Sequence, residues 1–594
     1  MQHRREFRFK AGLQASDYRH VKFRHFTDED WSIKTKEIYI GKEEYFSQQI
    51  ILNALNGETL YSISNKNLIS WRGLINRIRM DIEIEEESLK DCFKLSFMQY
   101  ISNDLNVEVA EPIGDMDFIE AEDGITQAVI LEGKIPKEYD KDNLKLKINF
   151  YLQNGFEEEK KIETLELDLK IYDFVFEDLR SSNDFILDLW QHPSSWARYY
   201  EVGLWSEDHF KIIENMLEEL ASMGNKIITV IASDFPWSGQ LCDEVMKNPS
   251  NLYEYNMIET IRDINGDFIF DYSIMDRYID IAMSVGIDKE IDIFGFSGIW
   301  EMGMGSPFED CPEPIKISYF DKKTGTIKYI KKEEELRLYL KSLIEHLKEK
   351  GVYDITRIIS DHPNDDEIFE ERKKYIEHLV HPHRFEYKSA MYLEQIIRDH
   401  YKKLDELSLC SAALLQIGDD MPEIKKEINE KGGYATWYVC WFPERPNNFI
   451  ESPLIDNRLI GWFTYLFGMD GFLRWDYALW TTDPWKDIRY KYPYWKAGDM
   501  FFVYPGRNMK PKRSLRWENL RYGIQDYQLF KRLEEIGYTR QEILERFVQP
   551  LLGEIKNYEV NNSRSVKIKY DENLSAYMKV KREILSILER VDTE

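Results

Sequence analysis

The strongest constraint on the fold is a repeating order of segments between residues 185 and 475. Short apolar segments of strand length alternate there with amphipathic segments of helix length. Eight apolar segments fit this order: Phe185–Leu189, Ile227–Ile231, Ile291–Phe296, Ile355–Ile359, Arg384–Lys388, Leu407–Leu409, Ala435–Cys440 and Gly471–Trp475. The helical segments between them include Glu207–Met223, Met275–Val285, Glu333–Lys350 and Asp366–Val380. This alternation predicts a (β/α)8 barrel.

A doubly wound parallel sheet would show the same alternation and is the structural alternative. Nucleotide-binding sheets of that kind carry a glycine-rich loop after the first strand. The chain contains neither a Gly-x-Gly-x-x-Gly loop nor a Walker loop. The barrel is therefore preferred, and nucleotide chemistry has no support.

Strand patterns dominate the chain before the barrel. Leu144–Leu152 and Thr164–Tyr172 alternate apolar and polar residues, which is typical of half-buried antiparallel strands. After Asp499 the strand-like segment MFFVYPG precedes a helical segment, Leu515–Ile536. We expect three regions: an N-terminal antiparallel β-sandwich over residues 1–178, a catalytic barrel over 179–498, and a closing strand and helices packed on the barrel over 499–594.

Charge and cysteine content exclude several classes of function. The formal net charge of −28 repels phosphate backbones and anionic membrane surfaces. No apolar run approaches the roughly 18 residues of a membrane span, and the first residues, MQHRREFRFKAGLQ, lack the apolar core of a secretory signal. The 5 cysteines are scattered and form no CxxC pair, which fits a reducing compartment. We expect a cytoplasmic protein without metal, organic cofactor, nucleic-acid partner or membrane insertion, and leave its oligomeric state open.

Polar and aromatic residues follow six of the predicted barrel strands. Catalytic groups of such barrels lie at the carboxyl ends of the strands. A sugar has an apolar C–H face and a rim of hydroxyls, so flat rings beside fixed polar groups suit it. The predicted sugar-site residues at these strand ends are Trp190, His192, Asp234, Trp300, Glu301, Asp361, His362, Tyr438, Trp475 and Asp476.

Asp361 stands out because RIISDHP leads from an apolar strand directly into two ionisable residues. Asp361 either caps the helix that begins near Asp365 or supplies a carboxylate that orients or stabilises a reacting sugar. His362 is a proton donor, a hydrogen-bond partner of the substrate or a packing residue. Glycosidases ordinarily use two such groups. Further candidates for the acid are Glu301, Asp234, Asp476 and Glu518, and sequence alone does not choose among them.

A series of motifs in the last third of the chain carries a family resemblance. They are Pro443 with Pro446 and Asn447, Gly461-Trp462, Gly471–Trp475, Gly498-Asp499, Tyr504–Gly506, and Ser514 with Arg516 and Glu518. Together they resemble glycoside hydrolase family 123 and its wider DUF4091 group. Upstream, LWQHPSSWARYY and FDYSIMDRYIDIAMSVGI look like barrel units of the same family. The resemblance extends over roughly residues 130 to 540.

The resemblance implies a β-sandwich and barrel that hydrolyse oligosaccharides or glycoconjugates with β-linked N-acetylgalactosamine. In this family the substrate's acetamido carbonyl attacks C1, an Asp holds the acetamido N–H, and the adjacent Glu protonates the leaving oxygen. The Asp carries over to Asp361. The family's Asp-Glu-Pro is Asp361-His362-Pro363 here.

Three interpretations follow from the missing Glu. His362 acts as the acid, another carboxylate such as Glu301 replaces it, or the chain has turned to a sugar without the acetamido group or into an inactive carbohydrate-binding barrel. The resemblance also singles out Arg516 and Glu518, which are either pocket residues or part of an internal ion pair.

Overall fold

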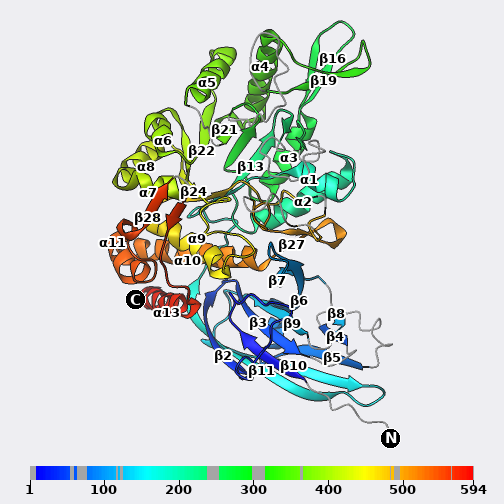
Figure 1. The fold of residues 1–594 in the computed structure, drawn as a ribbon, viewed down its shortest axis with the longest axis vertical. Helices are drawn as coiled ribbons and strands as arrows, with labels where there is room; N and C mark the ends of the chain where they lie inside the picture. The colour runs from blue at the N-terminus through cyan, green and yellow to red at the C-terminus, as the bar shows by residue number, and fades with distance from the viewer. Residues whose placement is uncertain are drawn as a thin grey trace.

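The computed structural model describes residues 9–53, 59–62, 76–115, 118–120, 125–236, 253–297, 315–361, 366–481, 483–486, 488, 495–562 and 565–592. Two mostly antiparallel sheets come first (Figure 1). One has the order β1 (Lys10–Gln14), β3 (Phe46–Asn53), β9 (Thr126–Gly133), β6 (Phe93–Ser102) and β7 (Glu108–Ile113). The other has the order β2 (Thr35–Lys42), β11 (Lys160–Val175), β10 (Asn143–Asn154), β5 (Asn76–Ile84), β4 (Thr59–Ser62) and β8 (Phe118–Glu120).

The two sheets share one hydrophobic core. Leu165, Leu167 and Leu169 alternate along β11 with more exposed residues, so one face of the strand is buried. This face packs in the same cluster as Ile50 of β3 and Leu131 of β9, which belong to the other sheet. Face-to-face packing of this kind agrees with the predicted sandwich.

The barrel is a single sheet of eight parallel strands. Its order is β12 (Ile186–Leu189), β25 (Gly471–Arg474), β24 (Ala435–Tyr438), β23 (Glu406–Cys410), β22 (Glu386–Met391), β21 (Thr356–Asp361), β18 (Glu290–Phe294) and β13 (Ile227–Ile231). Each predicted strand segment overlaps one of these strands. Between β12 and β13, the backbone pairing found among the described residues is a single bridge between Leu187 and Asn225, so the barrel is mostly closed.

Helices follow the strands and cover the barrel, with bounds close to those expected for the long ones. These are α1 (Pro193–Tyr199), α2 (Glu207–Ala221), α3 (Ser273–Ser284), α4 (Glu333–Lys350), α5 (Asp366–Val380), α6 (Glu394–His400), α7 (Ser411–Ile417), α8 (Met421–Glu430) and α9 (Leu454–Phe467). Helix α4 shows why the helix ends could be predicted from the sequence. Three Glu residues occupy its first turn, and Gly351 ends it at φ 80°.

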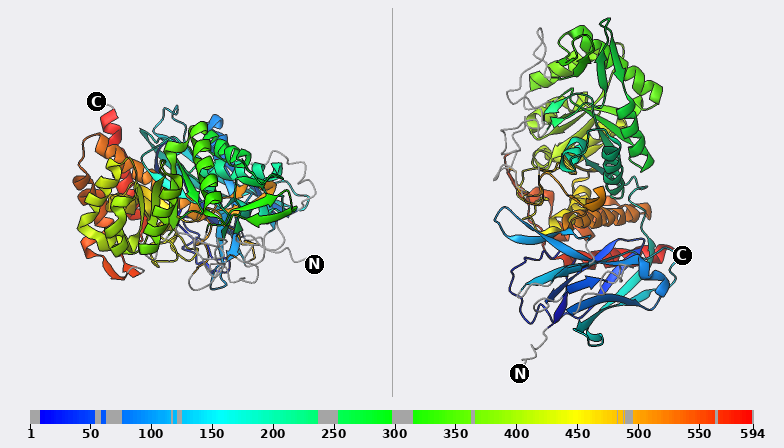
Figure 2. Two further views of the ribbon diagram at one scale, coloured as in Figure 1. Left: turned by 90° about the horizontal axis from the view of Figure 1, so that it is seen from above. Right: turned by 90° about the vertical axis from the view of Figure 1, so that its right-hand side faces the viewer.

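The last part of the chain lies between the barrel and the N-terminal sheets. Helix α10 (Leu515–Glu535) packs along α9, and α13 (Leu574–Asp592) lies beside them (Figures 1 and 2). A Cβ on Gly461 would lie 1.9 Å from the carbonyl oxygen of Gly523, so the two helices touch through their glycines. The expected strand in MFFVYPG is short: Tyr504–Pro505 (β26) pairs with Pro511–Lys512 (β27), and Phe501 makes a single bridge to Ala478.

A small sheet rises from the loops that follow β13 and β18. Its order is β17 (Phe268–Asp271), β16 (Glu259–Arg262), β19 (Ser318–Asp321) and β20 (Thr326–Tyr329). Figure 1 shows β16 and β19 at the end of the molecule farthest from the N-terminal sheets. Loops that follow barrel strands leave from their carboxyl ends, so this sheet stands on the same side of the barrel as the candidate site.

Candidate active site

Asp361 is the last residue of β21 and lies on the lumen side of the barrel. Side chains two residues apart in a strand share a face, and Ile359 pairs with Lys388 of β22, whose ammonium reaches carboxylates of β12 and β18 inside the barrel. The Asp361 side chain is 7% exposed, and its residue pairs with Ala390 of β22. Asp361 thus ends a strand at the carboxyl rim, five positions before the first residue of α5.

Tyr438 is the electrostatic neighbour of Asp361 at this rim. It is the last residue of β24 and is buried. Burial raises the pKa of the Tyr438 hydroxyl well above its usual value, and the nearby Cys410, Cys440 and Asp361 raise it further. The phenol therefore keeps its proton and remains a potential hydrogen-bond donor at this rim, where it feels the charge of Asp361.

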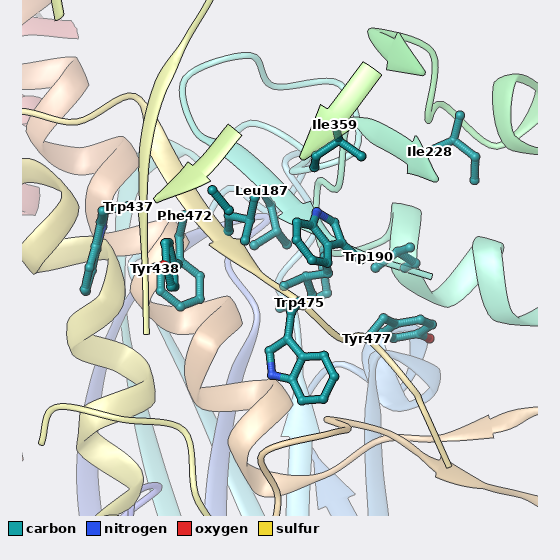
Figure 3. Packing of buried hydrophobic residues seen from close by; sticks show 14 of the residues in the cluster. Leu187, Trp190, Ile228, Ile359, Trp437, Tyr438, Phe472, Trp475 and Tyr477 are labelled. Carbon is teal, nitrogen blue, oxygen red and sulfur yellow. The ribbon is translucent and has the colours of Figure 1, made fainter. Parts of the chain in front are cut away.

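Trp190 and Trp475 extend β12 and β25, which are neighbours in the sheet (Figure 3). The main-chain N–H of Trp190 donates to the carbonyl of Arg474, at 3.2 Å. The Trp190 ring meets Phe294 edge-on, with centroids 4.7 Å apart, and is completely buried. Trp475 is 7% exposed, and its indole N–H donates to Asp499. Of the two rings, Trp475 is the one with surface left for a ligand.

His192 connects the first and last strands of the barrel. Its Nε2 lies 2.9 Å from the carbonyl oxygen of Trp475, and its Nδ1 lies 3.9 Å from Oε1 of Glu254. Burial lowers the pKa of His192 to about 4 and raises that of Glu254 to about 7. Because a carbonyl only accepts, the neutral imidazole carries its proton on Nε2. Glu254 also accepts from the main-chain N–H of Ser194.

Three residues at the site were missed by the sequence prediction. Glu254 lies in a two-residue strand, β15 (Tyr253–Glu254), which has no periodicity to reveal it. Trp495 lies 5.3 Å from Trp475 and 6.4 Å from Trp441, measured between ring centroids. Both Trp441 and Trp495 are partly exposed. The three indoles form an aromatic surface in which neighbouring ring planes are tilted by 56° and 53°. Its exposed parts could pack against the C–H face of a sugar. The strand-end position of Trp441 was a usable signal.

Asp234 lies on the rim, where its carboxylate holds two loops by hydrogen bonds. Its carboxylate accepts from the main-chain N–H groups of Ser318, at 3.0 Å, and Asn256, at 3.4 Å. Burial raises the pKa of this carboxyl. Asp234 thereby fixes the first residue of β19 and the approach to β16 over the end of β13.

Asp476 points into the protein interior beside Arg474. The Arg474 Nε lies 3.3 Å from its carboxylate, and both side chains are completely buried. Arg474 also bonds to Asp499, at 2.6 Å. Burial raises the pKa of Asp476 well above its usual value, and the Asp499 charge adds to this although Arg474 opposes it.

Arg516 and Glu518 are engaged in internal ion pairs, but with other partners than each other. Arg516 Nε donates to Glu111 of β7 at 2.6 Å, and its other nitrogens donate to main-chain carbonyls. Glu518 binds Arg513 and Arg521. Of the two interpretations for these residues, the internal one describes their contacts.

A buried charge cluster lies one layer below Asp361 in the barrel lumen. Lys388 of β22 contacts Asp188 at 2.6 Å and both Glu290 and Asp292 at 2.9 Å. Burial raises the pKa of Asp292 well above its usual range, while Lys388 and hydrogen bonds from neighbouring carboxyls outweigh burial at Glu290 and lower its pKa. Lys388 is therefore the cation shared by three buried carboxyl groups.

The remaining predicted site residues, His362, Trp300 and Glu301, lie outside the described residues. Within the described ranges, no group of three His, Cys, Asp or Glu side chains has a geometry suited to a metal ion. In the same ranges, no helix has the length and apolar character needed to cross a bilayer.

One comparison with a solved structure agrees with this architecture over the whole chain. A family 123 glycoside hydrolase from Clostridium perfringens, solved in a study of glycolipid glycan hydrolysis, superimposes with a TM-score of 0.75 at 21% identity, covering 98% of each chain. Bifidobacterium dentium β-glucuronidase and the Thermotoga neapolitana α-amylase AmyB match with TM-scores of 0.28 and 0.24, at 11% and 15% identity. The first match covers 86% of this chain and 66% of the other, and the second covers 50% and 67%. No curated protein sequence matches significantly.

A sequence profile of the family decides the assignment. The profile described as the catalytic domain of glycoside hydrolase 123 matches residues 190–533, which contain all the barrel strands from β13 to β25 and helix α9. The chain belongs to glycoside hydrolase family 123.

Proposed function

We propose that this glycoside hydrolase cleaves a β-linked N-acetylhexosamine, with N-acetylgalactosamine as the expected sugar, by a substrate-assisted retaining mechanism. The observation that carries the proposal is the place of Asp361. It is a carboxylate at the carboxyl end of a barrel strand, on the lumen side, beside the protonated hydroxyl of Tyr438. Its companions at the rim include the aromatic surface of Trp475, Trp495 and Trp441.

The proposed first step needs little from the protein except position and charge. The acetamido oxygen of the substrate attacks C1, the bond from C1 to the leaving oxygen breaks, and an acid supplies a proton to that oxygen. Asp361 accepts the acetamido N–H and stabilises the positive charge of the oxazolinium. Water then attacks C1 and gives a proton to the group that acted as the acid, which restores that acid. The bond between C1 and the acetamido oxygen breaks, which restores the acetamido group. Because the nucleophile is intramolecular, correct positioning supplies much of the acceleration.

We assign the proton donor to His362, which follows Asp361 where the family has Glu. A histidine has an ordinary pKa near 6.5, so at neutral pH only a minor fraction carries the proton. The hydrolysis rate is therefore expected to fall as pH rises above that range.

The test is release of a chromophore from aryl 2-acetamido-2-deoxy-β-galactoside. As natural substrates we propose lipid-linked glycans, because the Clostridium perfringens relative was solved in a study of glycolipid glycan hydrolysis. Asp361→Asn is expected to lower kcat/KM by at least about two orders of magnitude. Asp288→Asn is the matched control, because Asp288 is an exposed carboxylate just before β18, at the opposite end of the barrel. Equal turnover in both variants would remove Asp361 from the chemistry.

The substitution at His362 also supports a second candidate, a carbohydrate-binding barrel without hydrolytic activity. This candidate predicts sugar binding by calorimetry and no cleavage of any aryl glycoside. His362→Glu restores the family's Asp-Glu pair. Activity that appears only in His362→Glu would identify a decayed enzyme, whereas activity in the natural chain that is lost in His362→Ala supports the histidine acid.

A further inference from the structure

The small sheet at the rim has one packed face and one exposed face. On the packed face, the rings of Phe270 and Tyr339 lie 5.3 Å apart and those of Phe268 and Tyr319 lie 5.1 Å apart. Side chains alternate along each strand, so the intervening residues point to the opposite face. The alternating burial of β17 and β19 follows this division.

Four apolar residues form one row across the exposed face. Ile261 of β16 pairs with Ile269 of β17 on one side and with Phe320 of β19 on the other. Phe320 pairs in turn with Ile327 of β20. Ile269, Phe320 and Ile327 are 47%, 40% and 63% exposed. Scattered exposed apolar residues need no explanation, but a row that continues across a whole sheet marks an interaction surface.

Charges on the two halves of this face have opposite signs. On the β16 and β17 half, Glu259, Asp263, Asp267 and Asp271 flank the apolar row. On the β19 and β20 half, the alternation places Lys322 and Lys331 on the same face. A uniformly anionic or cationic partner would be repelled by one half of the face, because like charges brought together lower affinity.

We propose that this face docks against the same face of a second copy of the chain. A twofold axis parallel to the strands and between the two sheets places one apolar row over the other. The same axis brings the acidic half of one copy over the basic half of its partner, with Lys322 near Asp263 and Asp267. An isologous contact needs this kind of self-complementary patch. The inference concerns assembly and does not rest on the proposed reaction.

Charge reversal tests the pairing. Two variants that are monomeric alone should associate when mixed, and a simple loss of stability would not produce this result. One variant carries Lys322→Glu and Lys331→Glu. The other carries Lys in place of all four acidic residues of the opposite half: Glu259→Lys, Asp263→Lys, Asp267→Lys and Asp271→Lys. Each variant alone places like charges opposite each other and is expected to remain at the mass of one chain. An equimolar mixture restores opposite charges at every contact, so the mass is expected to double again, which is also the result expected for the unmodified protein at high concentration.

Light scattering after size exclusion measures the mass, and circular dichroism shows that each variant is folded. Ile327→Asp interrupts the apolar row and is also expected to halve the mass. A single-chain mass for the unmodified protein at every concentration would overturn the proposal. So would a doubled mass that persists in both reversed variants, or a monomer that cosediments with anionic vesicles through Lys322 and Ile327, which would identify the face as a lipid-binding surface.

Discussion

Nε2 of His192 lies 2.9 Å from the main-chain carbonyl oxygen of Trp475, and this contact joins the end of β12 to the end of β25. The contact therefore links the first and the last barrel strand along the chain, which are neighbours in the sheet. It also positions the backbone that carries the Trp475 indole. His192 was predicted to line the sugar site. Its contact instead makes it a positioning residue for Trp475, another predicted residue of that site.

His192→Ala is expected to destabilise the fold by about 1–3 kcal/mol, because the buried Trp475 carbonyl loses its donor. Urea unfolding followed by circular dichroism measures this loss. If His192 positions Trp475, KM for an aryl glycoside rises more than kcat falls. His192→Asn retains a donor near the carbonyl and should recover part of both effects; an equal defect in the two variants would contradict the positioning role.

Glu254 predicts a dependence of stability on pH. Its pKa is about 7 in the folded protein and near 4.5 when unfolded, so between these values the folded state binds more protons. Stability therefore falls as pH rises through this window, by up to about 3 kcal/mol.

Glu254→Gln removes this titration, so its unfolding free energy relative to the unmodified protein should increase from low to neutral pH. His192 contributes with the opposite sign, since its folded pKa is lowered to about 4, but it is present in both proteins and cancels in the difference. Urea unfolding at a series of pH values gives the comparison. A difference that stays constant with pH would mean that Glu254 is ionised in the folded protein.

The Lys388 cluster predicts a large effect from one buried charge. Lys388→Met leaves Asp188, Glu290 and Asp292 without their shared cation and should cost about 3–5 kcal/mol at neutral pH. The loss should shrink in acid, where the carboxyls are protonated. Adding Asp292→Asn to Lys388→Met should recover part of it. Equal stability of Lys388→Met and the unmodified protein at neutral pH would show that the cluster carries no net negative charge.

Local patterns were sufficient for the barrel strands and for the strand-end position of Asp361, because an apolar run followed at once by a carboxylate is visible in the sequence. Contacts between distant segments were not readable. Glu254 meets His192 only through the packing of a two-residue strand against α1. Arg516 could not be assigned because its partner Glu111 lies 405 positions away. The expected strand at MFFVYPG is mostly irregular, since its apolar residues are buried between the barrel and α10 without forming a ladder.

Arg516 gives a test that separates a structural from a sugar-binding role. Its guanidinium binds Glu111 of the N-terminal sheets and the carbonyls of Asn448, Gly498 and Phe501. A lysine offers a single nitrogen, so Arg516→Lys cannot reproduce these bonds and should cost at least about 2 kcal/mol. Well below its melting temperature, the Arg516→Lys variant should have the same KM as the unmodified protein, because the Arg516 side chain is completely buried. A raised KM with unchanged unfolding free energy would instead return Arg516 to the sugar site.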